Sequence, residues 1–209
     1  MRFNPVQILL SLPAVFLAMS FHEFAHAYTA YKMGDPTPKY QGRLTLDPLA
    51  HVDWIGVIMF AIFGFGWAKP VEVNPVNFKN RKWGDILVSL SGPAANLILA
   101  FTVFLIFIFT RPYLSHIPFL TDIINYIVTL NIVFSILNLI PIPPFDGYHV
   151  IKDLFFRKYA SFFWQYEKYS IFVLVGCILL GVFDLVVGAP AGYIYSLFWK
   201  IGMSLVGFF

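Results

Sequence analysis

Charged side chains and cysteine are both scarce in this chain. Asp, Glu, Lys and Arg make up 12% of its 209 residues, and hydrophobic side chains make up 59%. Soluble globular domains carry about 25% charged residues, so this composition excludes a soluble domain and predicts a protein that lies in the lipid bilayer. The net charge of +3 is spread over separate loops, which excludes the basic stripe of a nucleic-acid-binding protein. The single cysteine, Cys177, excludes a disulfide or a cysteine-based metal cluster within the chain.

The sequence contains several long apolar runs. A helix needs about 20 apolar residues to cross a bilayer, and the candidate runs are Val6 to Tyr31, Asp85 to Thr110, Ile123 to Ile140, Ser170 to Val187 and, marginally, Tyr193 to Phe209. A sixth run, Trp54 to Trp67, is shorter and carries Gly56, Gly64 and Gly66, which favours a re-entrant segment. We therefore expect an all-α polytopic membrane protein with about five transmembrane helices plus a re-entrant segment. It forms a single domain over residues 1–209, with core motifs in residues 6–147 and C-terminal helices in residues 168–209.

The basic residues test whether the sixth run crosses the membrane. If Trp54 to Trp67 is re-entrant, 11 of the 14 Lys and Arg residues fall on one face. Loops rich in Lys and Arg stay in the cytoplasm, so we expect an integral protein of the bacterial cell (cytoplasmic) membrane with its N-terminus outside. The cytoplasmic set is Lys32, Lys39, Arg43, Lys69, Lys79, Arg81, Lys82, Lys152, Arg157, Lys158 and Lys168.

The most informative motif lies inside the first run. His22, Glu23 and His26 match the pattern H-E-x-x-H. Residues four apart share one face of a helix, so both imidazoles reach one metal ion while Glu23 lies beside the water that the metal binds. Two histidines and a glutamate inside a membrane helix are costly unless they are paired, hydrated or bound to an ion. The motif therefore predicts a metal site.

A catalytic zinc ion takes three protein ligands and keeps one position open for water, so a further ligand is needed. His22 is the seventeenth and Asn138 the sixteenth residue of a run that enters from the outer face, which places both at a depth of about 23 Å. The prolines after Asn138 cannot continue a helix, and unwound backbone at this depth is tolerated only where it is buried in protein or lines a wet cavity. An extended segment there would bring a carboxylate that follows the prolines back toward the two histidines. The candidates for the third ligand are Asp146, His149, His51 and Asp53.

A stretch of small residues, Ser91 to Asn96, lies within the run from Asp85 to Thr110. Small side chains let helices approach closely, and this packing role is the one we expect for Gly92. An asparagine in the interior of the membrane needs a hydrogen-bond partner. We therefore expect Asn96 to be a supporting residue of the active-site region.

These three segments together resemble the site-2 protease family of intramembrane zinc metalloproteases (peptidase family M50), in a compact form without a PDZ or CBS domain. The family's H-E-x-x-H motif matches His22 to His26, and its Asn-x-x-Pro-x-Pro-x-x-Asp-Gly pattern matches Asn138 to Gly147. Phe145 stands where the family usually has Leu. A third and looser signature matches Gly92, Pro93 and Asn96.

The resemblance implies roles for individual residues. One Zn²⁺ per chain is held by His22, His26 and Asp146, which decides among the candidate third ligands. Asn138 becomes a candidate for stabilising the tetrahedral intermediate. The substrate is implied to be a membrane-spanning segment of another protein, so the partners are that protein and the lipid bilayer. Because the chain leaves no room for a recognition domain, selectivity is expected to depend on a regulatory membrane partner, on prior trimming of the substrate, or on a gate formed by the enzyme's own helices.

The expected reaction is hydrolysis of a peptide bond by a zinc-activated water molecule, with Glu23 as the general base. The active site faces the cytoplasmic side. A non-proteolytic membrane metal-binding or transport protein is the alternative, and Glu23 discriminates between the two, because a storage or transport site needs no base beside an open coordination position. A membrane hydrolase of lipids or small amides, with the same zinc chemistry, is a further alternative.

A short membrane-associated β-hairpin is expected beside the site. Gly64 to Asn74 alternates apolar and polar residues after a glycine-rich turn, and Arg43 to Leu46 is its expected partner. A free edge there would bind an unwound substrate by strand addition. His51 has two interpretations, a structural histidine that is hydrogen-bonded in its loop or a gating or supporting residue of the metal site.

Overall fold

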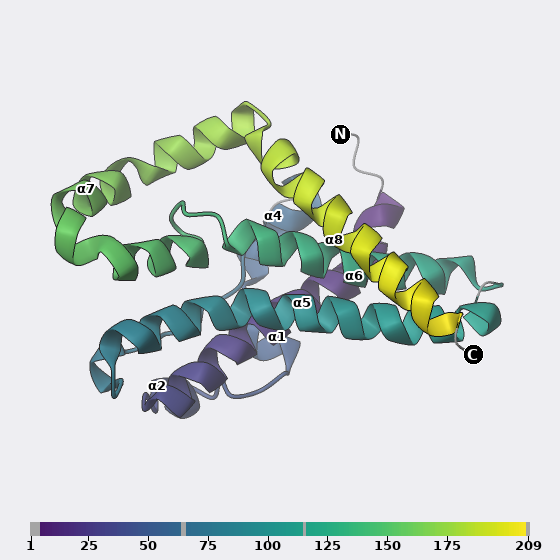
Figure 1. Ribbon diagram of the computed structural model, residues 1–209, viewed down its shortest axis with the longest axis horizontal. Helices are drawn as coiled ribbons and strands as arrows, with labels where there is room; N and C mark the ends of the chain where they lie inside the picture. Colours follow the sequence, from purple (N-terminus) through teal and green to yellow (C-terminus); the bar gives the residue numbers. More distant parts are fainter. Residues whose placement is uncertain (1–4, 64–65, 115, 208–209) are drawn as a thin grey trace.

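The structure is a computed structural model that describes residues 5–63, 66–114 and 116–207. Helices dominate these ranges, and the chain reverses direction several times between them (Figure 1). In chain order the elements are α1 (Pro5–Met33), α2 (Thr37–Tyr40), α3 (Pro48–His51), α4 (Trp54–Phe63), the 3₁₀ turn η1 (Pro75–Asn77), α5 (Arg81–Leu114), α6 (Pro118–Asn138), α7 (Asp146–Leu179) and α8 (Val182–Val206).

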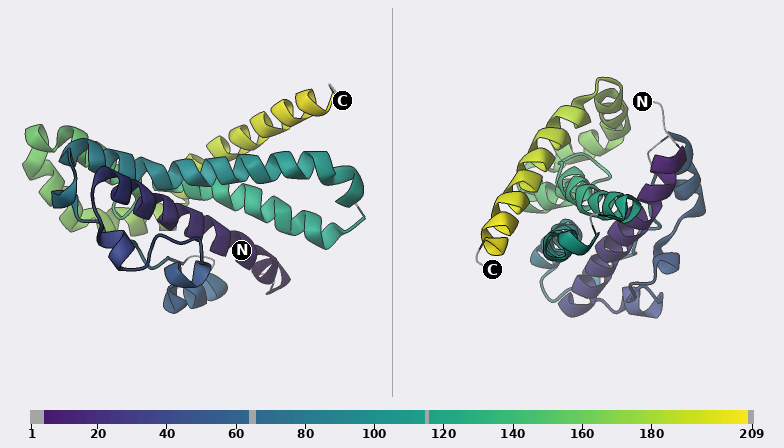
Figure 2. Two further views of the ribbon diagram at one scale, coloured as in Figure 1. Left: turned by 90° about the horizontal axis from the view of Figure 1, so that it is seen from below. Right: turned by 90° about the vertical axis from the view of Figure 1, so that its right-hand side faces the viewer.

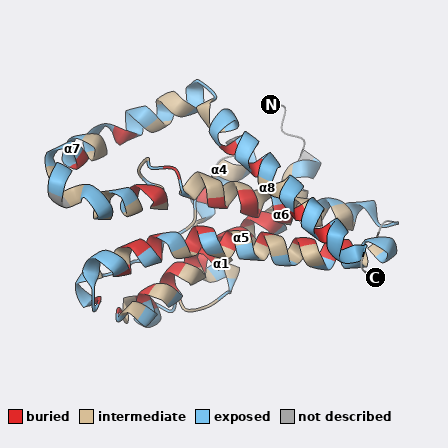
Figure 3. Ribbon diagram, viewed as in Figure 1, coloured by how far each residue is buried: buried red, intermediate tan, exposed pale blue. Residues whose placement is uncertain are grey.

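Helices α1, α5 and α6 lie side by side at the centre, and α8 crosses over α5 and α6 (Figures 1 and 2). The apolar core between α5, α6 and α8 contains Phe104, Val128, Ile132 and Phe198. Buried residues gather where the central helices face one another, while the outward faces are exposed (Figure 3). Many of these exposed side chains are large and apolar, which is the surface that a lipid environment requires.

Four helices within the described ranges are long and apolar enough to cross a bilayer. They are Val6–Met33, Arg81–Leu114, Pro118–Asn138 and Val182–Val206. The chain is therefore an integral membrane protein and helical, as the composition indicated.

The expected fifth span is not found in the described part of the chain. The run from Ser170 to Val187 is divided, because Gly181 adopts a left-handed conformation (φ 66°) between α7 and α8. Helix α8 then continues through Pro190, where the sequence suggested a loop before a separate span from Tyr193 to Phe209. A hydropathy run reports composition only, so it does not reveal that one left-handed glycine ends a helix inside the run.

Helix α7 replaces that span with a long excursion beyond the central bundle. Its backbone leaves the helical region at Tyr159 (φ −129°, ψ 34°), and two arms diverge from this bend (Figure 1). Lys152 of the first arm forms an ion pair with Glu167 of the second arm, with 2.6 Å between Nζ and Oε1. The ion pair lowers the pKa of the Glu167 carboxyl and joins the two arms.

The chain enters and leaves the segment from Trp54 to Trp67 at neighbouring positions. Helix α4 has 10 residues, so it rises only about 15 Å, half the thickness of the hydrocarbon core. Val52 forms an antiparallel bridge with Ala68, and the Lys69 amide donates to the His51 carbonyl at 2.9 Å. The residues that flank the segment, Val52 and Ala68, thus lie side by side, and the re-entrant placement of the segment in a membrane stays a prediction.

The expected β-hairpin is not confirmed. In the described ranges the chain forms the single Val52–Ala68 bridge and no β-strand, and Gly64 lies outside those ranges. Arg43 turns inward, where its guanidinium donates to the Ala50 carbonyl, so its side chain holds the local loop together.

The first prediction concerns topology. The Lys79 amide donates to the Met33 carbonyl at 3.2 Å, so the end of α1 and the start of α5 lie together. In a Cys177→Ser background, Lys39→Cys and Lys79→Cys should react with a membrane-impermeant thiol reagent from the same side of sealed vesicles. His116→Cys, at the turn between α5 and α6, should react from the opposite side. Labelling of positions 39 and 79 from opposite sides would show that the segment between them crosses.

Candidate metal centre and active site

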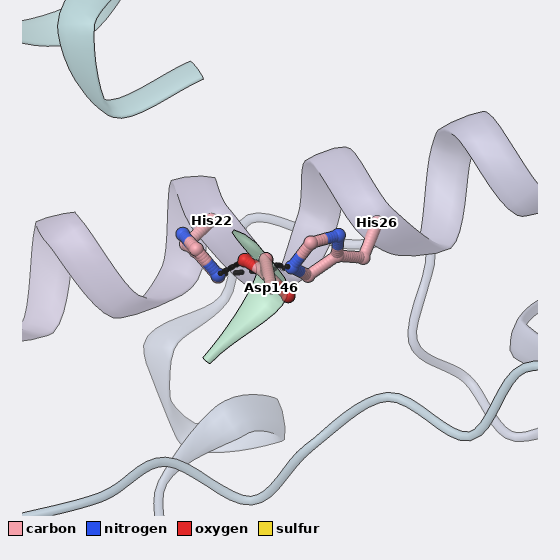
Figure 4. Close-up of side chains that lie close together, drawn as sticks. All are labelled: His22, His26 and Asp146. Atoms are coloured by element: carbon pink, nitrogen blue, oxygen red, sulfur yellow. Dashed lines mark hydrogen bonds and ion pairs between the residues drawn. The ribbon is translucent and has the colours of Figure 1, made fainter. Parts of the chain in front are cut away.

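Two histidines and one aspartate meet between α1 and the start of α7. His22 and His26 lie one turn apart on α1, both buried, with their Nε2 atoms 2.9 Å apart. Asp146 places Oδ2 3.1 Å from Nε2 of His22 and 3.3 Å from Nε2 of His26 (Figure 4). The ligand atoms of all three residues lie within 4.8 Å of one another, which is the arrangement of a site for one metal ion.

The proline-rich link between α6 and α7 delivers Asp146 to this position. Helix α6 ends at Asn138, and the chain turns through residues 139–145 before α7 begins. A Cβ atom on Gly147 would lie 2.2 Å from the Leu139 carbonyl oxygen. Only glycine therefore lets the first turn of α7 pack this closely against the end of α6, and this close approach folds the Asp146 carboxylate back toward the histidines.

Hydrogen bonds on the far side of each imidazole fix where its proton lies. Nδ1 of His22 is 2.8 Å from Oδ1 of Asn96, and Nδ1 of His26 is 2.8 Å from the Val88 carbonyl oxygen. Because both oxygens only accept, each Nδ1 carries a proton, and in the neutral imidazole Nε2 then presents a lone pair to the centre of the cluster.

These lone pairs explain why Asp146 Oδ2 is buried without a hydrogen-bond donor among the described residues. The neighbours of Oδ2 are two acceptor nitrogens, and three acceptors at these distances repel one another. The cluster therefore needs a positive charge at its centre. Two imidazole nitrogens and a carboxylate oxygen are a ligand set that catalytic zinc uses, so the donor set fits a zinc ion.

Gly92 of α5 packs against the imidazoles next to their Nε2 atoms. A Cβ atom there would lie 2.6 Å from both Cε1 of His22 and Nε2 of His26. Gly92 therefore has the packing role that we expected, and the side chains that it packs against are the candidate ligands His22 and His26.

Asn96 lies one turn further along α5, fully buried. Besides contacting His22, its Nδ2 donates to the Ala18 carbonyl at 3.0 Å and to Oδ1 of Asn131 at 2.8 Å. Of these two asparagines, Asn96 was predicted from the sequence to support the site, and Asn131 of α6 was not. The signal for Asn131 was available, because an asparagine in the interior of an apolar run also needs a partner.

Glu23 and Asn138 line one cavity together with His22 and Pro144. Oε2 of Glu23 accepts from the Val71 amide at 2.9 Å. Nδ2 of Asn138 donates to the Phe134 carbonyl at 3.0 Å, which leaves the second N–H of this amide to serve another acceptor. The structure thus brings the expected base and the expected oxyanion donor to the same cavity as the ligands.

Asp35, which was also not predicted from the sequence, anchors the segment that lies over Glu23. Its buried carboxylate accepts from the Asn74 amide and from Nδ2 of Asn77, each at 2.7 Å, and from Thr37. Burial alone would raise the pKa of Asp35, but these hydrogen bonds outweigh it and lower the pKa. An ionised Asp35 therefore holds the chain before α5 against the end of α1.

The other candidate ligands lie outside the three-residue cluster. Asp53 accepts from the amides of Ile55 and Gly56 at the start of α4. His51 is fully buried and pairs Nε2 with the Thr45 carbonyl oxygen at 2.9 Å, a contact that fits the structural interpretation. His149 lines the cavity near Asp146, and burial lowers its pKa.

Comparisons with known proteins agree with this geometry. The model of peptidase family M50 matches residues 113–181, which contain Asn138 and Asp146. The "Putative zinc metalloprotease YwhC" of Bacillus subtilis is 41% identical over 164 residues, covering 76% of this chain and 75% of that protein. The chain belongs to peptidase family M50.

A second relative matches over a smaller share of both chains. The "Putative zinc metalloprotease Rip2" of Mycolicibacterium smegmatis is 33% identical over 143 residues, covering 65% of this M50 chain. The match spans only 53% of that relative's length. No solved structure matches the chain.

The second prediction tests the close packing of Gly92 against the candidate ligands of this M50 chain. Gly92→Ala places a methyl group against both imidazoles, so it should weaken Zn²⁺ binding by at least about tenfold, the effect of disturbing ligand orientation. Affinity is measured by competition with a chromogenic chelator. Gly188→Ala, in the open surface of α8, is the matched control and should bind as the wild type does. Unchanged affinity in Gly92→Ala would contradict the observed packing.

Proposed function

We propose that this chain is an intramembrane zinc metalloendopeptidase that hydrolyses peptide bonds in or near transmembrane segments of other membrane proteins. The observation that carries the proposal is the convergence of His22, His26 and Asp146 on one point beside Glu23. Both histidines and Glu23 lie on a helix that is long and apolar enough to span the bilayer. In this proposal His22, His26 and Asp146 hold one Zn²⁺.

The depth of the site supports a substrate within the membrane. His22 follows Val6, the first residue of the α1 span, by about 23 to 24 Å of helix rise. That distance places the site in the half of a ~30 Å core that lies opposite the N-terminus. The basic loops lie on the same side, so we propose that the site faces the cytoplasm, in the cytoplasmic membrane.

An apolar approach to the site also supports this substrate class. A cavity between α1, α4 and α6 is lined without any charged side chain. It shares its lining with the cavity of Glu23 and Asn138 at Met19, Gly66, Trp67, Phe134 and Leu137. A transmembrane segment of a substrate suits such a lining better than a polar soluble peptide does.

Each functional group has a chemical role in the proposal. Bound zinc supplies a Lewis acid that polarises the scissile carbonyl and lowers the pKa of water. With Oε2 held by the Val71 amide, Oε1 of Glu23 accepts the proton of the attacking water and passes it to the leaving amine. The second Nδ2–H of Asn138 donates to the oxyanion that develops on the carbonyl oxygen.

The segment from Val71 to Asn74 supplies an edge for the substrate. Its ends are anchored by the bonds of Val71 to Glu23 and of Asn74 to Asp35. Between these anchors, the amides of Glu72 and Val73 have no hydrogen-bond partner in the described part of the chain. We propose that an unwound substrate pairs with this edge by strand addition.

The third prediction separates catalysis from metal binding. Glu23→Gln should bind Zn²⁺ as tightly as the wild type, because it removes no ligand. Its turnover should fall by about 10²- to 10⁴-fold, because it removes the base. Cleavage is measured on transmembrane peptides in liposomes. Some of these peptides carry Gly or Pro, which reduce the stability of a helix by about 1 and 3 kcal/mol relative to Ala. Glu167→Gln, the same substitution in α7, should retain activity.

Two outcomes would contradict the proposed function. Full cleavage by a rigorously metal-free preparation would exclude a metalloprotease. A wild-type protein that binds zinc and cleaves none of the transmembrane peptides would instead favour a metal-binding or transport function.

A further inference from the structure

We propose that Asn131 is a positioning residue of the metal centre. It holds the side-chain amide of Asn96 in one orientation, and Asn96 in turn holds His22 in the tautomer that binds a metal ion. The inference rests on the proposed metal centre and adds to it a relay that runs from α6 through α5 to α1.

The relay is a continuous chain of buried hydrogen bonds. Nδ2 of Asn131 donates to the Ile127 carbonyl at 2.8 Å, and Oδ1 of Asn131 accepts from Nδ2 of Asn96 at 2.8 Å. Oδ1 of Asn96 accepts from Nδ1 of His22, also at 2.8 Å. Asn96 and Asn131 are both 0% exposed, so water does not replace a lost partner at no cost.

Backbone carbonyls fix the direction of every bond in the relay. Because the Ala18 and Ile127 carbonyls only accept, the atoms that face them must be the Nδ2 atoms of Asn96 and Asn131. Turning either amide over would set an oxygen against a carbonyl oxygen. Both amides therefore have one allowed orientation, and that orientation points Oδ1 of Asn96 at His22.

The orientation of Asn96 decides the tautomer of His22. An acceptor at Nδ1 requires the proton to lie there, which leaves the lone pair of Nε2 toward His26 and Asp146. The opposite tautomer sets a lone pair against Oδ1 of Asn96 and places a proton on Nε2, where it blocks the metal. The Asn96 contact is thus the one that prepares His22 for the metal.

The two histidines are supported in different ways. His26 relies on the backbone carbonyl of Val88, which no side-chain substitution removes, whereas His22 relies on side chains from two other helices. Asn131 is needed because Asn96 carries two N–H groups, and Ala18 satisfies only one of them. Loss of Asn131 leaves the other unpaired in the bundle, which favours rotation of the amide away from His22.

The test compares substitutions on α6 in the purified full-length chain. Asn131→Leu and Asn131→Ala both delete the acceptor for Asn96, so either variant that folds is sufficient. Asn131→Asp retains the acceptor, and in this apolar setting its second oxygen is expected to be protonated and to donate to Ile127. Asn125→Leu is the matched control, because Asn125 also lies on α6 and contacts Tyr195 instead of the relay.

Zn²⁺ affinity and the visible absorption spectrum of the Co²⁺-substituted protein are the readouts. The deletion variants should bind Zn²⁺ about 10- to 100-fold more weakly, as expected when a partner of a ligand histidine is lost, and their Co²⁺ spectra should change. Asn131→Asp and Asn125→Leu should resemble the wild type in both measurements.

Two results would overturn the relay. One is wild-type Zn²⁺ affinity and an unchanged Co²⁺ spectrum in the deletion variants. The other is equal weakening in Asn125→Leu, which would mean that any substitution on α6 disturbs the bundle. Failure of the proposed function is a separate result, because it appears in the wild type itself, as the absence of Zn²⁺ binding or of cleavage of the transmembrane peptides.

Discussion

Three groups that can each act as a hydrogen-bond acceptor converge on one point inside an apolar helical bundle. Nε2 of His22, Nε2 of His26 and Oδ2 of Asp146 lie about as close together as hydrogen-bonded atoms do, yet with neutral imidazoles each presents a lone pair to the others. Such a cluster is stable only around a positive charge. Much of the central architecture follows from this requirement, because each neighbouring helix contributes a contact that keeps the three acceptors in place.

The contributions differ from helix to helix. Helix α1 carries both histidines, α5 provides Gly92, which packs against both imidazoles, and the Val88 carbonyl as a hydrogen-bond acceptor, and α6 provides Asn131 for the relay. Helix α7 begins at the third ligand because the proline-rich link turns the chain back after α6. The site is thus formed by tertiary packing around a local motif, and the same packing exposes Glu23 to the cavity through which an apolar substrate is proposed to approach.

The sequence predicted the parts that depend on local spacing. His22 and His26 share a helix face because they lie four residues apart, and the prolines after Asn138 indicated a break before Asp146. Hydropathy found the four long helices of the membrane bundle and overcounted by one, because the left-handed Gly181 is a conformational feature that apolar composition hides. The partners of Asn131 and Asp35 could not be named from the sequence, because they lie 35 to 42 residues away in the chain. An asparagine inside an apolar run still indicated that Asn131 needs a partner.

Zinc K-edge X-ray absorption of the zinc-loaded chain tests the metal centre most directly. The account predicts a first shell of nitrogen and oxygen atoms at about 2.0–2.2 Å, with the outer-shell scattering of two imidazole rings. That scattering should fall to one ring in His22→Ala and in His26→Ala, and both rings should remain in Asp146→Ala. A sulfur shell at about 2.3 Å, or a spectrum that none of the three substitutions changes, would place the metal elsewhere and contradict the account.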